Sequence, residues 1–136
     1  MEPVAINYLA VIVAAVAYLI IGSLWYSPLL FGSAWMKGIG KTKEQLAGGA
    51  TLINYILALI FGFIASYGIA RILLWRGGGG ISDGIITGLL VSVCFVLATF
   101  FMNDIFEKRP AGLTFINALF HIVALIVAGI IIGAWR

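Results

Sequence analysis

The sequence has 136 residues, of which 63% are apolar and only 10% are charged, and its mean hydropathy is +1.17. A soluble globule of this length needs more polar surface, so the composition excludes a soluble domain and indicates an integral membrane protein. The formal charge of +3 forms no basic block, which excludes nucleic acid as a partner. Because Cys94 is the only cysteine, an intramolecular disulfide, a redox pair and a cysteine zinc site are excluded too.

Four apolar runs are long enough to cross a bilayer, since a hydrocarbon core of about 30 Å needs roughly 20 helical residues. These runs are residues 4–26, 52–75, 85–102 and 113–135. The first run has no basic segment before it and no small-residue cleavage site after it, so we expect a retained span rather than a signal peptide. The sequence predicts an all-α, four-helix membrane bundle that forms one transmembrane domain over residues 1–136, with the lipid bilayer as its partner.

The first span is followed by a segment with an apolar surface too short to cross a membrane. Ser27 and Pro28 resemble a helix N-cap followed by proline at the first helical position. We therefore predict a short interfacial helix at residues 28–36, with an ordinary hydrophobic loop as the alternative. Amphipathic aromatic rings favour the headgroup layer. The predicted interface anchors are Trp25, Tyr26, Trp35, Trp75 and Trp135.

Two polar links carry helix-start signals. Residues 42–45 read Thr-Lys-Glu-Gln, which matches a capping box and predicts a helical turn. Residues 77–80 are four glycines, which predict a flexible connector with Ser82 or Asp83 available to cap the third span.

Four spans place both termini on one side, the first face, and the links at residues 37–50 and 103–112 on the other, the second face. Basic residues favour the second face, with Lys37, Lys41, Lys43, Lys108 and Arg109 there against Arg71, Arg76 and Arg136 on the first face. The positive-inside rule then predicts a cytoplasmic second face and termini outside. The difference of five basic residues on the second face against three on the first is small, so insertion in both orientations is also permitted.

Small residues recur at four-residue spacing on several spans. They are Ala10 and Ala14; Ala58, Gly62, Ser66 and Ala70; Gly84, Gly88 and Ser92; and Gly129 and Gly133. In lipid, close backbone approach along such rows supplies the attraction between helices. More rows than one bundle needs predict self-association into a homo-oligomer.

Polar side chains of all four spans are predicted to meet in the half of the membrane next to the second face. They are Tyr26, Asn54, Asn103, Asp104, Asn117 and His121. His121 lies well inside the hydrocarbon, because about eleven residues at 1.5 Å each separate it from Pro110. An intramembrane ionisable group is a functional candidate that can carry a proton, relay one to Asp104 or ligate a metal. The alternative is a neutral imidazole that only fastens helices through Asn54, Asn103 or Asn117.

Catalysis has little support in the sequence. No motif joins Ser27, Ser66 or Ser92 to His121, and one histidine allows only one axial haem ligand per chain. We therefore predict no catalytic residue, no metal and no cofactor.

Several stretches along the chain form a recognisable set. They are Asn7-Tyr8-Leu9-Ala10-Val11, the run from Leu24 to Gly32 with Ala34-Trp35-Met36, Phe106-Glu107-Lys108-Arg109-Pro110, and Ile116-Asn117-Ala118 with His121 and Gly133-Ala134-Trp135. Together they resemble a bacterial family of small four-span membrane proteins, domain of unknown function 1761. The resemblance implies a membrane location and this architecture, and it implies no activity; we expect the membrane to be the bacterial inner membrane.

The leading hypothesis is a homo-oligomeric binder or conduit for a small solute or ion, through a polar pocket open to the second face. The runner-up is a non-catalytic scaffold or accessory subunit. A third hypothesis is an enzyme acting on a lipid, which needs a substrate-sized cleft beside Tyr26 and His121.

Overall fold

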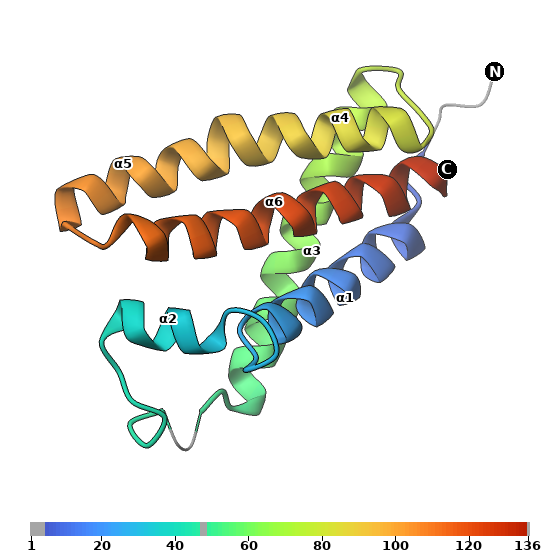
Figure 1. Cartoon of the computed structure of the whole chain (residues 1–136). Helices are drawn as coiled ribbons and strands as arrows, with labels where there is room; N and C mark the ends of the chain where they lie inside the picture. Colours follow the sequence, from blue (N-terminus) through green and yellow to red (C-terminus); the bar gives the residue numbers. More distant parts are fainter. Residues whose placement is uncertain (1–4, 47–48, 136) are drawn as a thin grey trace.

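The computed structural model describes residues 5–46 and 49–135, and these residues form an all-helical chain (Figure 1). Val4 and Arg136, where the start of the first span and a first-face charge are predicted, lie outside the described residues. The helices are α1 (Tyr8–Trp25), α2 (Gly32–Ile39), α3 (Leu52–Trp75), α4 (Ile81–Val91), the π-helical turn η1 (Ser92–Leu97), α5 (Ala98–Glu107) and α6 (Ala111–Ala134).

Four segments are long and apolar enough to cross a membrane, which confirms the predicted helical membrane bundle. They are α1, α3, the continuous segment Ile81–Glu107 and α6. The third segment extends past Met102, where we had expected it to end. In this extension Asp104 is buried, and its carboxylate accepts a hydrogen bond from the Thr114 hydroxyl at 2.6 Å and lies 3.9 Å from Arg109. The helix stops at Lys108, which adopts the left-handed conformation with φ of 56°.

Helices α1 and α6 are antiparallel neighbours joined at both ends. Asn7 caps α1 by accepting the Ala10 N–H at 3.2 Å, and its amide donates to the carbonyl of Trp135 at 3.0 Å. At the opposite end, the indole N–H of Trp25 donates to the carbonyl of Ile116 at 2.9 Å. The start of α1 and the end of α6 therefore share one end of the bundle, the first face (Figure 1).

The short helix differs from its predicted position. It begins at Gly32 rather than at Pro28, and the Ser27 hydroxyl donates to the Leu24 carbonyl at 2.6 Å instead of capping a helix. The preceding chain is held in a tight turn, because the N–H groups of Phe31 and Gly32 donate to the carbonyls of Trp25 and Ser27. A side chain at Gly32 would not fit, since a Cβ there would lie 2.7 Å from two backbone oxygens.

The predicted cap at residues 42–45 is confirmed. Thr42 N–H donates to the Gln45 side chain at 2.8 Å, and Gln45 N–H donates to the Thr42 hydroxyl at 3.2 Å. The start of α4 differs: Gly80 is its N-cap, and the Asp83 carboxylate reaches back to accept the Gly79 N–H at 2.8 Å.

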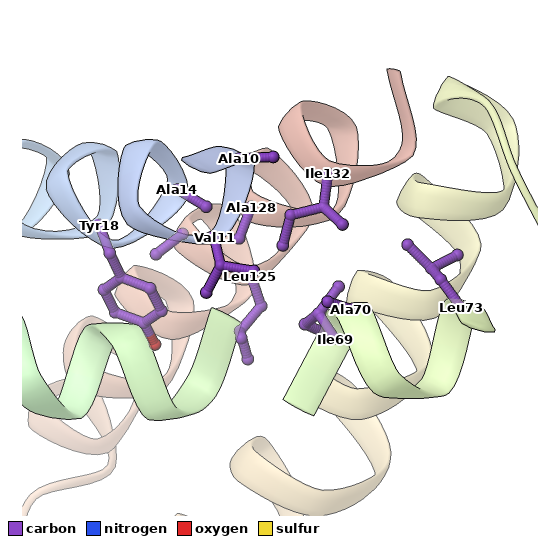
Figure 2. Close-up of a cluster of buried hydrophobic side chains, with 11 residues drawn as sticks. Ala10, Val11, Ala14, Tyr18, Ile69, Ala70, Leu73, Leu125, Ala128 and Ile132 are labelled. Atoms are coloured by element: carbon purple, nitrogen blue, oxygen red, sulfur yellow. The ribbon is translucent and has the colours of Figure 1, made fainter. Parts of the chain in front are cut away.

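Near the first face the helices pack closely, and we call this region the closed half. A Cβ added to Gly84 of α4 would lie 1.9 Å from the Gly129 carbonyl oxygen, and one added to Gly88 would lie 2.5 Å from the Leu125 oxygen. The core cluster joins α1, α3 and α6 through residues that include Val11, Ile69 and Ala128 (Figure 2). Most of the predicted small residues therefore pack between helices of the same chain, whereas Ala58 of α3 is exposed.

Near the second face the helices separate, and we call this region the open half. Helix α3 is tied to α4 at the first face, where Arg76 donates to the Thr87 hydroxyl at 2.8 Å and lies 3.7 Å from the Asp83 carboxylate. From there α3 crosses α6 and runs away from α5 (Figure 1). Helices α3 and α5 therefore diverge towards the second face.

Candidate functional site

The open half contains a cavity of about 1300 Å³. Its walls come from α1, α3, α6 and the η1–α5 segment, and the chain after α2 contributes at the second-face end. The lining residues are Tyr18, Leu19, Gly22, Ser23, Tyr26, Trp35, Gln45, Leu46, Gly49, Ala50, Asn54, Tyr55, Ala58, Phe61, Gly62, Ala65, Val91, Phe95, Val96, Thr99, Phe100, Phe120, His121 and Leu125. None of these described lining residues is charged, and most are apolar or aromatic.

The deepest polar groups of the cavity are Tyr18 and His121. The Tyr18 hydroxyl and Nδ1 of His121 form a hydrogen bond. The imidazole lies nearly parallel to the Phe100 ring, with centroids 5.6 Å apart, and next to Phe120 at 4.6 Å. Aromatic rings therefore hold His121 in place, and its Nε2 hydrogen-bonds to no group among the described residues.

A second polar contact lies nearer the second face. The Tyr26 hydroxyl donates to the Asn117 side-chain oxygen at 2.7 Å, and the Tyr26 ring packs edge-on against Trp35. Tyr26 lines the cavity, whereas Asn117 lies behind it. Because the bond joins the end of α1 to the start of α6, it orients the Tyr26 ring in the cavity wall.

Amide groups lie at the second-face end of the cavity. Asn54 accepts both the backbone N–H and the hydroxyl of Thr51 at 2.9 Å, which completes a capping box for α3. Gln45 accepts the Thr42 N–H through its side-chain oxygen. Both residues line the cavity, so their NH₂ groups can donate to a molecule there.

Asn103 and Asp104 lie apart from this cavity. Asn103 is exposed, whereas Asp104 is only 7% exposed. The Asp104 carboxylate accepts the hydrogen bond from Thr114 that joins α5 to α6 across the turn. Arg109 closes the same turn, 3.9 Å from the Asp104 carboxylate. Its hydrogen bond to Glu107, at 2.8 Å, raises the pKa of Arg109. Of the six residues predicted to share one chamber, only Tyr26, Asn54 and His121 line it.

The wall formed by the third span contains the π-helical turn η1. The lining positions 91, 95, 96, 99 and 100 follow the wider turn of a π-helix, which brings Phe95 and Phe100 to the same side. The Phe95 carbonyl accepts the Ala98 N–H and also the Thr99 hydroxyl, the latter at 2.6 Å. The irregular turn therefore gives this wall its shape.

Comparison with known protein families gives a match over most of the chain. The family model described as "Protein of unknown function (DUF1761)" matches residues 9–133. The chain belongs to this family. No curated protein and no solved structure matches the chain. The DUF1761 description states no activity, so a function for this member has to be argued from the cavity.

The partner of His121 in the cavity wall, which sequence reasoning missed in this DUF1761 chain, is Tyr18. We had considered Asn54, Asn103, Asn117 and Asp104 as partners of His121, and its partner is Tyr18. One signal was present in the sequence: Tyr18 lies in the middle of a span, far from the interface where tyrosine is usual. A hydroxyl at that depth requires a partner inside the protein.

Metal binding has no geometric support in the described residues. Residues 5–46 and 49–135 contain no group of three or more His, Cys, Asp or Glu side chains able to hold an ion. Cys94 is exposed on η1 and does not line the cavity.

Proposed function

We propose that this chain binds a neutral, lipid-like molecule from the bilayer in the cavity of its open half. The observation that carries the proposal is a space of about 1300 Å³ with mostly apolar walls and a Tyr18–His121 pair at its deep end. Small-molecule sites usually have volumes of about 300–1000 Å³, apolar walls and a few placed polar groups. This cavity is large enough for a molecule with a hydrocarbon tail.

The exposed aromatic residues along the cavity favour entry from the side. Phe61 of α3 and Phe95 of η1 line the cavity, yet they are 65% and 64% exposed. In a membrane these exposed rings contact lipid tails. A hydrocarbon chain can therefore pass between α3 and η1–α5 without crossing the polar headgroup layer.

A neutral ligand fits better than an ion. Ions in a low-dielectric site need charged or multiple polar partners, and the described lining residues include no Asp, Glu, Lys or Arg. The closed half also fills the route towards the first face with packed side chains such as Ile69 and Ala128. We therefore favour binding over conduction.

The scaffold hypothesis accounts for some of the polar residues. The Tyr26–Asn117 and Thr114–Asp104 bonds join helices without involving a ligand. Hydrogen bonds that only join helices do not explain the cavity. It meets the size requirement of the lipid-enzyme hypothesis, but its walls offer only one imidazole and no carboxylate among the described residues, so we propose binding without turnover.

Self-association, a cytoplasmic second face and a bacterial inner-membrane location remain predictions for this chain. The glycine rows of α4 and α6 pack against each other inside the bundle, so a homo-oligomer has to rest on other surfaces. Cross-linking in a membrane tests the oligomer, and labelling of single cysteines from each side tests the orientation.

Binding is tested by ligand-induced thermal stabilisation of the purified protein in detergent, with a linear alkane and a linear methyl ketone of equal chain length as probes. Ala58 lines the cavity, so Ala58→Phe should fill part of it and abolish stabilisation by both probes. Ala98→Phe is the matched control, since Ala98 is exposed on α5 outside the cavity. Equal stabilisation of both variants, or no stabilisation of the wild type, would contradict the proposal.

A further inference from the structure

The Tyr18–His121 pair has a specific hydrogen-bonding capacity. A neutral imidazole has one N–H donor and one acceptor nitrogen. If the Tyr18 hydroxyl donates to Nδ1, the imidazole proton lies on Nε2 and both members of the bond are used. The reverse tautomer would leave the phenol proton and the bare Nε2 without partners among the described residues. The first arrangement leaves fewer groups unpaired, so Nε2–H is the donor that His121 offers to the cavity.

Three other hydroxyls of the cavity have their protons engaged within the protein. Ser23 donates to the Leu19 carbonyl at 3.0 Å, Thr99 donates to the Phe95 carbonyl, and Tyr26 donates to Asn117. The Tyr55 hydroxyl, in the first turn of α3, and the amide donors of Gln45 and Asn54 lie at the second-face end instead. His121 is therefore the donor at the deep end of the cavity.

Depth limits the chemistry of the group that His121 can meet. The ring lies about 16 Å along α6 from Pro110, and this distance is about half of a hydrocarbon core of roughly 30 Å. A phosphate or carboxylate at that depth would need a cation, and the described lining residues include none. A small neutral oxygen can be desolvated there if it receives a hydrogen bond.

We propose that His121 recognises the head group of the ligand, and that this head group is a neutral oxygen acceptor held near the middle of the membrane. The ligand is then a long-tailed ketone, quinone or alcohol whose polar end lies deeper than the headgroups of the surrounding lipids. Its tail leaves between Phe61 and Phe95. This inference rests on the proposed function, because it specifies the chemistry of a molecule in the same cavity.

The first test is nitrogen NMR of the histidine ring in the full chain. The chain has one histidine, so a ¹⁵N-histidine-labelled sample gives signals from that ring alone. We expect a protonated Nε2 and an acceptor Nδ1, with the Nε2–H signal moving when a linear methyl ketone is added. Tyr18→Phe removes the hydroxyl with little change in shape, and it should produce a mixture of tautomers. A wild-type ring protonated on Nδ1 would overturn the assignment.

The second test compares four probes of equal chain length: an alkane, a methyl ketone, a primary alcohol and a carboxylate. In the wild type we expect the ketone or the alcohol to bind about tenfold more tightly than the alkane, as one additional hydrogen bond provides. Whichever of the two binds more tightly identifies the head group as a carbonyl or a hydroxyl. His121→Phe should remove this preference without weakening alkane binding.

The controls separate the inference from the proposed function. Tyr18→Phe should reduce the preference while it keeps the fold, so the test remains decisive if His121→Phe does not fold. Asn103→Leu removes a polar group outside the cavity and should change nothing. Equal binding of alkane, ketone and alcohol to the wild type, or tightest binding of the carboxylate, would overturn the head-group assignment and leave the cavity proposal standing. No binding of any probe would overturn both.

Discussion

The closed and open halves of the bundle join the same helices by different means. In the closed half α4 and α6 approach so closely that a Cβ added to Gly84 would overlap the Gly129 carbonyl oxygen. In the open half contacts between helices depend on side-chain hydrogen bonds, such as Trp25 to the Ile116 carbonyl and Thr114 to Asp104. Close backbone approach leaves no space between helices, whereas long side chains keep them apart and leave room for a ligand.

The two halves are therefore expected to differ in role: the closed half stabilises the fold, and the open half binds a ligand. Burial of one helix against another gains little hydrophobic energy in lipid, so van der Waals contact along the glycine rows supplies much of the attraction. The closed half can therefore hold the bundle together while α3 and α5 diverge. We expect substitutions in the closed half to change stability most, and substitutions at the cavity wall to change binding most.

The largest effect is expected for Gly84→Ala. The new methyl would lie 1.9 Å from backbone atoms, which cannot move without separating α4 from α6. We expect a loss of about 3 kcal/mol in the free energy of unfolding, measured by denaturant titration in micelles. Gly68→Ala is the control, because a Cβ there meets nothing within 4 Å. If both variants are equally stable, the close packing of α4 on α6 is incorrect.

Thr114→Val tests the hydrogen bond that joins α6 to α5 in the open half. The substitution keeps the shape of the side chain and removes the hydroxyl that donates to the buried Asp104 carboxylate. We expect a loss of about 2 kcal/mol, since hydrogen bonds to charged groups contribute more than neutral ones. Asn103→Ala, on the exposed side of the same helix, should have almost no effect. A Thr114→Val protein as stable as the wild type would contradict this role.

Asn7→Ala removes the contact that joins the two chain ends at the first face. The variant loses the cap on the Ala10 N–H and the bond to the Trp135 carbonyl. We expect a loss of about 1 kcal/mol, typical of an N-cap substitution. Asn103→Ala again serves as the control. If Asn7→Ala lowers stability no more than Asn103→Ala does, Asn7 does not stabilise the start of α1.

Ser66→Ala should have the smallest effect. The Ser66 hydroxyl is fully buried in the closed half and has no hydrogen-bond partner among the described residues. Removing it should leave stability unchanged or raise it by up to about 1 kcal/mol. Ser92→Ala is the matched control, because the Ser92 hydroxyl is equally buried but donates to the Leu89 carbonyl at 3.1 Å. A greater loss at Ser66 than at Ser92 would indicate a partner for Ser66.

The spans could be predicted because apolar run length responds directly to membrane thickness. The third helix continues to Glu107, beyond the predicted span end at residue 102, and the contact of Asp104 with Thr114 in this extension is tertiary, beyond the turn. The predicted start of the short helix, at residue 28, was also wrong, because contacts outside the local pattern decide it. Ser27 and Pro28 carry the signals of a helix start, yet backbone bonds to Trp25 and Ser27 hold this stretch as a turn.

The site was predictable only in part. Depth along each span predicted that Tyr26, Asn54 and His121 lie in one half of the bundle, and all three line the cavity. Depth alone does not give the direction in which a side chain points, which is why Asn103 faces outward and Asn117 lies behind the wall. The divergence of α3 from α5 depends on packing at the first face. No local sequence pattern in either helix predicts this divergence.

The most direct test of the open half is photo-crosslinking in lipid nanodiscs with a methyl ketone that carries a diazirine on its tail, followed by mapping of the labelled peptides. We predict labels in the peptides that contain Phe61, Phe95 and Tyr18, all displaced by excess unlabelled ketone. Labels confined to outward positions such as Leu29 and Phe106, and unaffected by the competitor, would contradict a ligand cavity in this bundle.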